Sequence, residues 1–424
     1  MKIRISKIPL RLSDIVLLAF LVYSMGGSSS SSHLYISIGL LGMWVVCAFI
    51  TDPRTFQLAF KDRKILWLFL FLLYAFMTGL IVGDFSFEIK QFVAGFYMYS
   101  PILILNYYIK KDELDIGRLS AIVFCALAIM LFYSYKAIVF YGQHASAARY
   151  LAMNREKYGD IAIGGGYALA YGSAILSILL FSLLIEGRIE SRIKRLLAIG
   201  MILVGTLVVI TTQSTVAVVC WAISVVVAIV FRDKRENRGS VNAVVIKSFI
   251  VILSAAIIFF TIRYIGQFVM WIASTQEGMF ANRLRELGNV LIGEESFGSG
   301  YAFSRFTMPF KSIGTFFTHP LLGVNYMHGN NFLDSSLFGV GQHGEWADAL
   351  ANYGIIFGTC LIAIYVKQIK EVQKYNVGIS PAWWICLILI GLFNPVRTFN
   401  ANVNVFLVVP LIAIINSRSK MASQ

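Results

Sequence analysis

The sequence predicts an all-α protein that crosses a membrane about twelve times and carries a long helical loop on the outward side. Hydrophobic residues make up 58% of the 424 residues and charged residues only 14%, whereas about a quarter of a soluble domain is charged. The apolar residues are gathered in long runs such as 65–82, 196–212 and 215–231. Runs of about 18 or more apolar residues are typical of spanning helices, because a helix satisfies its own backbone groups in lipid.

Polar residues divide the apolar runs into candidate spans. The eleventh is short and is expected to bend at Asn394-Pro395, and the seventh and eighth are joined by a tight turn at Thr212 and Gln213. The candidate spans are 12–27, 34–50, 65–82, 91–109, 119–140, 161–185, 196–212, 214–231, 243–264, 347–366, 381–394 and 400–416. The fold expected from them is a polytopic helical membrane domain.

Lysine and arginine residues are unevenly divided between alternate loops. Most of the 36 lie in one set of loops, namely 2–11, 54–64, 110–118, 188–195, 232–238, 367–374 and 418–420. Cytoplasmic loops carry an excess of these residues, so both termini are predicted to be cytoplasmic, and an even number of spans agrees with this. The formal net charge of +14 is therefore interpreted as a topology signal, and no nucleic acid partner is expected.

The chain is expected to form one transmembrane domain over 1–424 with two outward loops, 141–160 and 274–346. A loop as long as the second one is usually functional or disordered. Its many aromatic residues predict short helices packed on the membrane domain. The five cysteines all fall within or beside predicted spans, which argues against a disulfide framework.

Several arginines remain on the outward side, where basic residues are disfavoured. They are Arg149, Arg155, Arg283, Arg285, Arg305 and Arg397. The guanidinium group is planar and always charged, so it suits phosphate oxygens. Such a cluster could bind a diphosphate head group whose lipid tail stays in the bilayer. The alternative interpretation is that the arginines pair with nearby carboxylates or extend to lipid head groups.

The segment 342–348 (Gln-His-Gly-Glu-Trp-Ala-Asp) lies where the long loop enters the tenth span. His343 is expected at the membrane surface near a helix N-terminus, whose dipole favours the neutral imidazole. A neutral imidazole can take a proton from an attacking hydroxyl group. Glu345 or Asp348 could orient His343 or act as the base instead. The alternative is an interfacial histidine without a chemical role. No cysteine or histidine spacing is typical of a metal site.

Three segments in and after the long loop match a known pattern. Residues 303–305 (Phe-Ser-Arg) and 317–324 (Phe-Thr-His-Pro-Leu-Leu-Gly-Val) precede the segment 343–358. These segments resemble the O-antigen polymerase and O-antigen ligase superfamily of membrane glycosyltransferases. The ligase motif H-[NSQ]-x9-G-x-x-[GTY] is matched only in part, because Gly344 follows the histidine and Phe357 occupies the last position. The resemblance therefore favours the polymerase.

The resemblance implies a metal-independent glycosyl transfer at the periplasmic face of a bacterial inner membrane. A hydroxyl group of a lipid-linked repeat unit would attack the anomeric carbon of the growing glycan, and undecaprenyl diphosphate would leave. His343 is expected to accept the proton, with Glu345 as second choice. The residues expected to bind the diphosphate and glycan are Arg149, Arg283, Arg285, Arg305 and Asp348.

The implied partners are the undecaprenyl-diphosphate-linked donor and acceptor, membrane lipid and a protein that regulates chain length; no cofactor is implied. Two alternatives stay open. A ligase would transfer the finished glycan to another acceptor, and a flippase or other transporter would move lipid-linked glycan across the membrane. The sequence places no Asp or Glu in the middle of a predicted span, which counts against ion-coupled transport.

Overall fold

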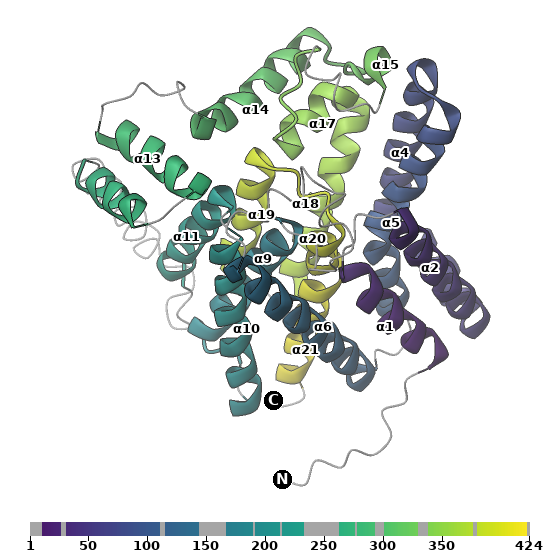
Figure 1. Ribbon diagram of the computed structural model, residues 1–424. Coiled ribbons are helices and arrows are strands. Elements are labelled where there is room, and N and C mark those ends of the chain that lie inside the picture. Colours follow the sequence, from purple (N-terminus) through teal and green to yellow (C-terminus); the bar gives the residue numbers. More distant parts are fainter. Residues whose placement is uncertain are drawn as a thin grey trace, which may run out of the picture.

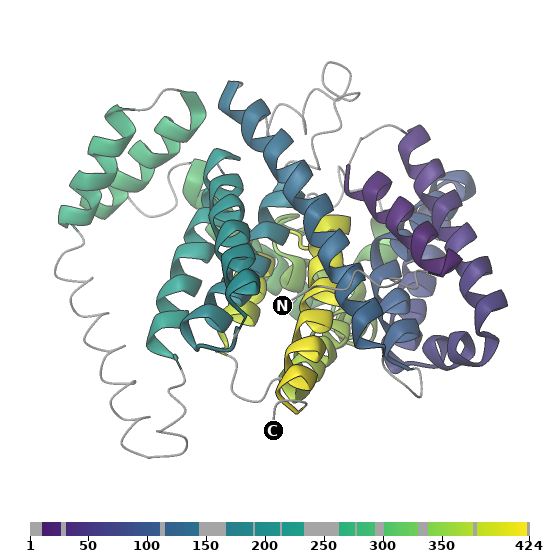
Figure 2. The same ribbon diagram turned by 90° about the horizontal axis from the view of Figure 1, so that it is seen from below.

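The computed structural model describes most of the chain as helix. The described residues are 11–26, 31–110, 115–143, 167–189, 191–212, 214–232, 263–275, 278–292, 301–329, 338–375 and 380–421. No strand occurs among them, so the all-α class is confirmed. The helices pack into one bundle, as Figures 1 and 2 show.

Eight helical segments in this part of the chain are long and apolar enough to cross a membrane. Six are single helices: α2 (Ser31–Thr51), α4 (Arg63–Val82), α5 (Phe85–Ile109), α6 (Ile116–Gln143), α9 (Tyr167–Ile185) and α10 (Arg192–Thr211). The seventh joins α17 (Glu345–Tyr353), the π-helix η2 (Gly354–Gly358) and α18 (Thr359–Tyr375). The eighth joins α20 (Phe399–Val403), the π-helix η3 (Asn404–Val408) and α21 (Val409–Met421).

Three shorter apolar helices complete this set: α1 (Leu12–Met25), α11 (Thr215–Val230) and α19 (Ala382–Phe393). Together the long and short helices coincide with every span that the sequence predicts except 243–264, which lies almost wholly outside the described residues. The protein is therefore a polytopic membrane protein.

The described part of the long loop 274–346 is largely helical. It contains α13 (Gly278–Ile292), α14 (Tyr301–Thr318) and α15 (Asn325–His328). In Figure 1, α14 and α15 lie at the end of the bundle opposite the C-terminal end of α21. In both views, α13 lies on the other side of the bundle from α4 and α5.

The turn after α14 packs directly against the junction of α17 and η2. The N–H of Val324 donates to the carbonyl of Ala351 at 2.9 Å, and the N–H of Ile355 donates to that of Pro320 at 2.7 Å. Gly354 has a φ of +65°, and a Cβ there would lie 2.1 Å from the carbonyl oxygen of Leu321. Only glycine fits this position without strain. Two of the segments singled out from the sequence are therefore in contact.

At the other end of α4, a cluster of charged residues joins α4 to α18. The side chain of Lys64 is fully buried, forms an ion pair with Glu371 and donates to Oε1 of Gln368 at 2.8 Å. Nζ of Lys367 lies 3.1 Å from Oδ1 of Asp62, which also accepts a hydrogen bond from the N–H of Lys64. These contacts join α4 to the span 345–375, and α4 and the α17 part of that span line the cavity described below.

Candidate functional site

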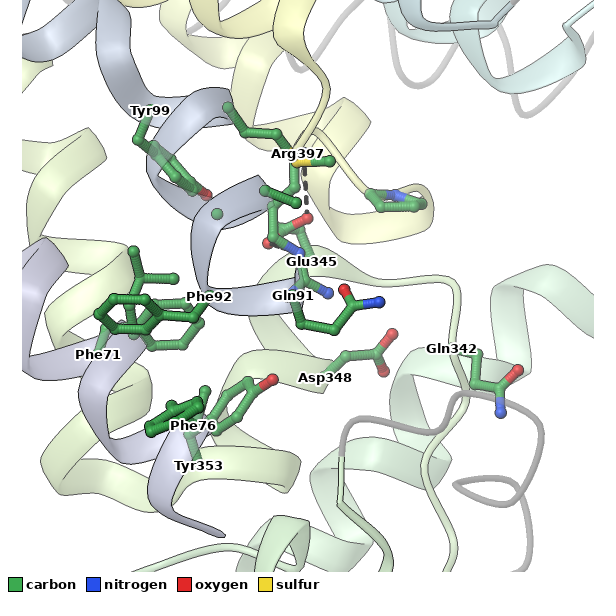
Figure 3. Close-up of a pocket in the computed structure, with 16 residues that line it drawn as sticks. Phe71, Phe76, Gln91, Phe92, Tyr99, Gln342, Glu345, Asp348, Tyr353 and Arg397 are labelled. Carbon is green, nitrogen blue, oxygen red and sulfur yellow. Dashed lines mark hydrogen bonds and ion pairs between the residues drawn. The ribbon is translucent and has the colours of Figure 1, made fainter. Parts of the chain in front are cut away.

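A cavity of about 380 Å³ lies between α4, α5, the first turns of α17 and the segment that follows α19. Glu345, Asp348 and Arg397 lie on one side of it, and the rings of Phe71, Phe76 and Tyr353 lie on the other (Figure 3). The polar lining residues are Gln91, Tyr99, Gln342, Glu345, Asp348, Tyr353 and Arg397. The apolar ones are Phe71, Leu72, Ala75, Phe76, Phe92, Ala94, Gly95, Met98 and Pro395.

The central contact of the polar side is an ion pair between Glu345 and Arg397. Nε of Arg397 lies 2.8 Å from Oε1 of Glu345, whose side chain is fully buried (Figure 3). Oε2 of Glu345 accepts hydrogen bonds from the N–H groups of Val396 and Arg397 at 3.1 and 3.3 Å. Burial disfavours the charged guanidinium, but Coulombic attraction to Glu345 outweighs it and raises the pKa of Arg397 above its usual value. The charge is therefore fixed at this position.

The ion pair exists because the chain leaves helical geometry between α19 and α20. α19 ends at Phe393 with Asn394 as its C-cap, and Pro395 has no N–H to continue a helix. The backbone then runs without helix over 395–398 before Thr398 caps α20, its hydroxyl accepting from the N–H of Ala401 at 3.3 Å. This break directs two backbone N–H groups and the guanidinium of Arg397 towards α17.

Asp348 lies one helical turn after Glu345 and also lines the cavity. The hydroxyl of Ser312 on α14 donates to its Oδ1 at 2.5 Å, and the N–H of Gly344 donates to its Oδ2 at 3.1 Å. The same hydroxyl accepts from the N–H of Gly341 at 2.8 Å. Residues three apart share a helix face, so the two carboxylates face the same cavity, and α14 fixes one of them.

Gln342 adds a strained backbone position at the edge of the cavity. Its φ is +65°, which makes it the only residue other than glycine with a positive φ in the described part of the chain. A side chain at positive φ is uncommon and costs energy, which the surrounding contacts must offset. The chain is therefore held in an unfavourable conformation immediately before His343.

Tyr99, which lines the cavity, belongs to a chain of tyrosine and asparagine contacts. The hydroxyl of Tyr365 donates to Oδ1 of Asn402 at 3.0 Å and lies 3.5 Å from that of Tyr99. Nδ2 of Asn402 donates to the carbonyl of Met98 at 3.0 Å. This chain of contacts links α5, α18 and α20.

The apolar side of the cavity is an aromatic wall supplied mainly by α4 and α5. The rings of Phe71 and Tyr353 meet edge to face with centroids 4.8 Å apart, and those of Phe76 and Phe92 lie 5.4 Å apart. Tyr74 stacks on Phe357 at 3.9 Å, and its hydroxyl donates to the carbonyl of Leu322 at 2.7 Å. The wall is therefore attached to both α17–η2 and the turn after α14.

Glu345 and Asp348 are the two sequence-predicted residues that the structure brings together at the cavity. His343 is half-buried, precedes α17 and is absent from the described lining. Arg285 is exposed on α13, where its Nη1 donates to Oδ1 of Asn282 at 2.9 Å. Arg149 lies outside the described residues, as do the side chains of Arg283 on α13 and Arg305 on α14.

Arg397 is the site residue that the selection from sequence missed. It belongs to the outward set of arginines, but the four residues selected from that set lie in the two long loops. The signal that could have identified it is Asn394-Pro395, which ends a span two residues before an arginine. Gln91, Tyr99 and Tyr353 carried no such signal, because a polar or tyrosine residue within an apolar run is common in membrane helices.

No group of three or more His, Cys, Asp or Glu side chains that could hold a metal ion occurs within the described ranges. The described cavity instead offers two carboxylates, one fixed cation and an aromatic wall. Comparison of the whole chain with known protein families and with curated proteins finds no match to either.

Proposed function

We propose that this protein polymerises undecaprenyl-diphosphate-linked oligosaccharide repeat units into a surface polysaccharide. It would act in a bacterial inner membrane, with both termini in the cytoplasm and the cavity towards the periplasm. The observation that carries the proposal is the combination of Glu345, Asp348 and Arg397 with an aromatic wall in one cavity of a membrane protein. The resemblance of residues 303–358 to the polymerase and ligase superfamily points in the same direction.

The substrate proposed has three parts that differ in chemistry, and the cavity has a counterpart for each. A diphosphate needs a fixed positive charge, which Arg397 supplies. A sugar hydroxyl needs hydrogen-bond acceptors, which the carboxylates and Gln91 supply. The first isoprene units of the carrier need an apolar surface, which Phe71, Phe76 and their neighbours supply.

In the proposed reaction, the oxygen of the acceptor hydroxyl forms a bond to the anomeric carbon of the donor glycan. The bond from that carbon to the diphosphate breaks, and its electron pair leaves with undecaprenyl diphosphate. The proton of the hydroxyl passes to a carboxylate. Arg397 stabilises the charge on the leaving diphosphate, and the arginines of α13 and α14 would add to it if those helices approach the bound substrate.

Asp348 is the better proton acceptor of the two carboxylates. Protonating Glu345 would remove the counter-ion of Arg397, whose side chain is only 22% exposed, and a charge with so little access to water is costly without a counter-ion. Asp348 accepts hydrogen bonds from the neutral Ser312 hydroxyl and the Gly344 N–H, so its protonation leaves no buried charge without a partner. The proposal therefore assigns proton transfer to Asp348 and the positioning of Arg397 to Glu345, with His343 as the competing base.

The decisive experiment is a surface-polysaccharide gel of a strain that lacks this protein. Loss of a polymerase leaves a single repeat unit attached to the final acceptor, so one short band is expected in place of a ladder. Loss of a ligase or a flippase leaves no attached glycan. A ladder of normal length in the deletion strain would refute the proposal.

Transport of a lipid-linked glycan is the second candidate, and one observation favours it. Two π-helical segments, Gly354–Gly358 and Asn404–Val408, interrupt the two spans that begin at the cavity. Such interruptions are frequent at functional sites. In reconstituted vesicles, a transporter would move lipid-linked glycan between leaflets without lengthening it, whereas a polymerase would lengthen it without moving it.

A further inference from the structure

A second cavity, of about 540 Å³, opens between α6, α9, α10 and the C-terminal part of α21. We call it the α10 groove. The span that begins at Phe399, beside the candidate site, reaches the groove at Asn416. At about 1.5 Å per residue, this is roughly 25 Å away. The two cavities share no described lining residue, so the α10 groove is a separate feature.

The groove is open to the surroundings of the bundle. Phe124 on α6 and Leu197 on α10 both line it, and they are 60% and 50% exposed. Figures 1 and 2 show α6 beside α21, with α10 close by. Because these are membrane-spanning helices, the molecules that surround the groove over its apolar part are lipids.

Each wall of the groove changes from polar to apolar from the end of the bundle inward. The polar residues lie where α6 and α10 begin and towards the end of α21, and the apolar residues lie further into the bundle. The pairs, from the bundle end inward, are Ser120 and Leu127 on α6, Lys194 and Met201 on α10, and Asn416 and Ile412 on α21. The pairs on α6 and α10 are seven residues apart, or about 10 Å, and the pair on α21 is four residues apart, or about 6 Å. The groove therefore has a polar mouth and an apolar interior.

The mouth is positively charged. Nε of Arg188 lies 2.6 Å from Oε2 of Glu186, so this arginine is neutralised locally. Lys194 is exposed and takes part in no ion pair with a described residue. Ser191 precedes the first residue of α10 and makes no side-chain capping hydrogen bond. No Asp or Glu occurs among the described lining residues. A cation, a hydroxyl group and the positive end of a helix thus lie together at the mouth of the groove.

We propose that the α10 groove binds an anionic phospholipid. The phosphate group is held by Lys194, Ser191 and the N-terminus of α10, and one acyl chain occupies the apolar interior. A small soluble anion would not need the apolar walls, and a neutral lipid would not need the lysine. The orientation predicted from the sequence puts this end of the bundle on the cytoplasmic side, where anionic lipids give the membrane its negative surface potential. The proposal does not depend on the function assigned to the other cavity.

Native mass spectrometry of the full-length protein in detergent tests this assignment. Phosphatidylglycerol and phosphatidylcholine with identical acyl chains are the two probes. Wild type should retain phosphatidylglycerol in clear preference to phosphatidylcholine, and Lys194→Gln should lower that retention about fivefold to tenfold, the loss expected for one charged hydrogen bond. Arg192→Gln is the matched control, because Arg192 is exposed in the same helical turn but does not line the groove.

A second variant tests the acyl-chain part independently. Ala198 lines the groove and is buried, so Ala198→Trp should fill the groove and abolish retention of phosphatidylglycerol. Thermal unfolding checks that this variant is folded. If it is not, Leu197→Ser is the milder substitute. Equal retention of the two lipids by wild type, or unchanged retention by Lys194→Gln, would overturn the proposal. Displacement of the lipid by millimolar inorganic phosphate would also overturn it, since the groove would then be a site for a free anion.

Discussion

The guanidinium Nε of Arg397 lies 2.8 Å from Oε1 of Glu345, so the non-helical segment between α19 and α20 is ion-paired to the first turn of α17. The two residues are 52 positions apart in the chain. Glu345 is the first residue of α17, Arg397 lies in the segment that follows α19, and both line the same cavity. The pair therefore fixes the relative positions of two membrane spans as well as the charge available to a substrate.

Replacing Arg397 with Gln should destabilise the protein by about 3–5 kcal/mol, because Glu345 would remain buried without its cation. The midpoint of thermal unfolding in detergent measures this loss, and long glycan should be absent from the surface-polysaccharide gel. The double variant Arg397→Met with Glu345→Leu should regain much of the stability but no polymerisation. Arg285→Gln, at an exposed position on α13, serves as the control for stability. If the single and double variants unfold at the same temperature, the ion pair does not have this role.

Asp348→Asn should reduce polymerisation about 10²-fold to 10⁴-fold, the range expected for loss of a general base, while the folded yield stays close to wild type. The assay is the distribution of chain lengths formed by purified protein from lipid-linked repeat units. His343→Ala is compared under the same conditions and should keep long chains. Inactive His343→Ala beside active Asp348→Asn would return the proton transfer to His343, as the sequence alone predicts.

Gly354→Ala should destabilise the protein by more than about 2 kcal/mol, since the new Cβ would lie 2.1 Å from the carbonyl oxygen of Leu321 at a positive φ. Gly314 is the matched control, because a Cβ there meets nothing within 4 Å and the residue is exposed on α14. Gly314→Ala should stabilise slightly, by about 0.5–1 kcal/mol. The measurement is the midpoint of thermal unfolding of the two variants. Equal midpoints would show that the turn after α14 can move to accommodate the new Cβ at little cost.

Acidification should weaken the contact between α4 and α18. Burial raises the pKa of Asp62, but the hydrogen bond from the Lys64 N–H and the charges of Lys64 and Lys367 outweigh it, so the folded-state pKa lies below the usual value. A carboxyl group with a depressed pKa contributes stability at neutral pH, and this stability is lost as the pH falls through the unfolded and then the folded pKa. The unfolding midpoint of wild type should therefore fall below about pH 4 more steeply than that of Asp62→Asn. Parallel pH profiles would contradict this.

The spans could be predicted from the sequence because lipid imposes one simple condition, a long apolar run that satisfies its own backbone. Position 345 could be found for a related reason, since charged residues where a loop enters an apolar helix are conspicuous. The partner of Glu345 could not be found in this way. Arg397 reaches the cavity only because α17, α5 and the end of α19 pack together, and hydrophobicity does not specify which spans are neighbours.

The π-helix at Asn404–Val408 has a geometric consequence for the span it interrupts. A π turn contains one residue more than an α turn, so residues after it are rotated by about 100° relative to an uninterrupted α-helix. Asn402, which accepts a hydrogen bond from Tyr365, precedes the π turn, and Ile412 and Asn416, on the wall of the α10 groove, follow it. Deleting one residue within this π turn would restore α geometry. The face that carries Asn416 would then rotate by about 100° relative to the face that carries Asn402. The number of residues between Asn402 and Asn416 thus determines the angle between those faces.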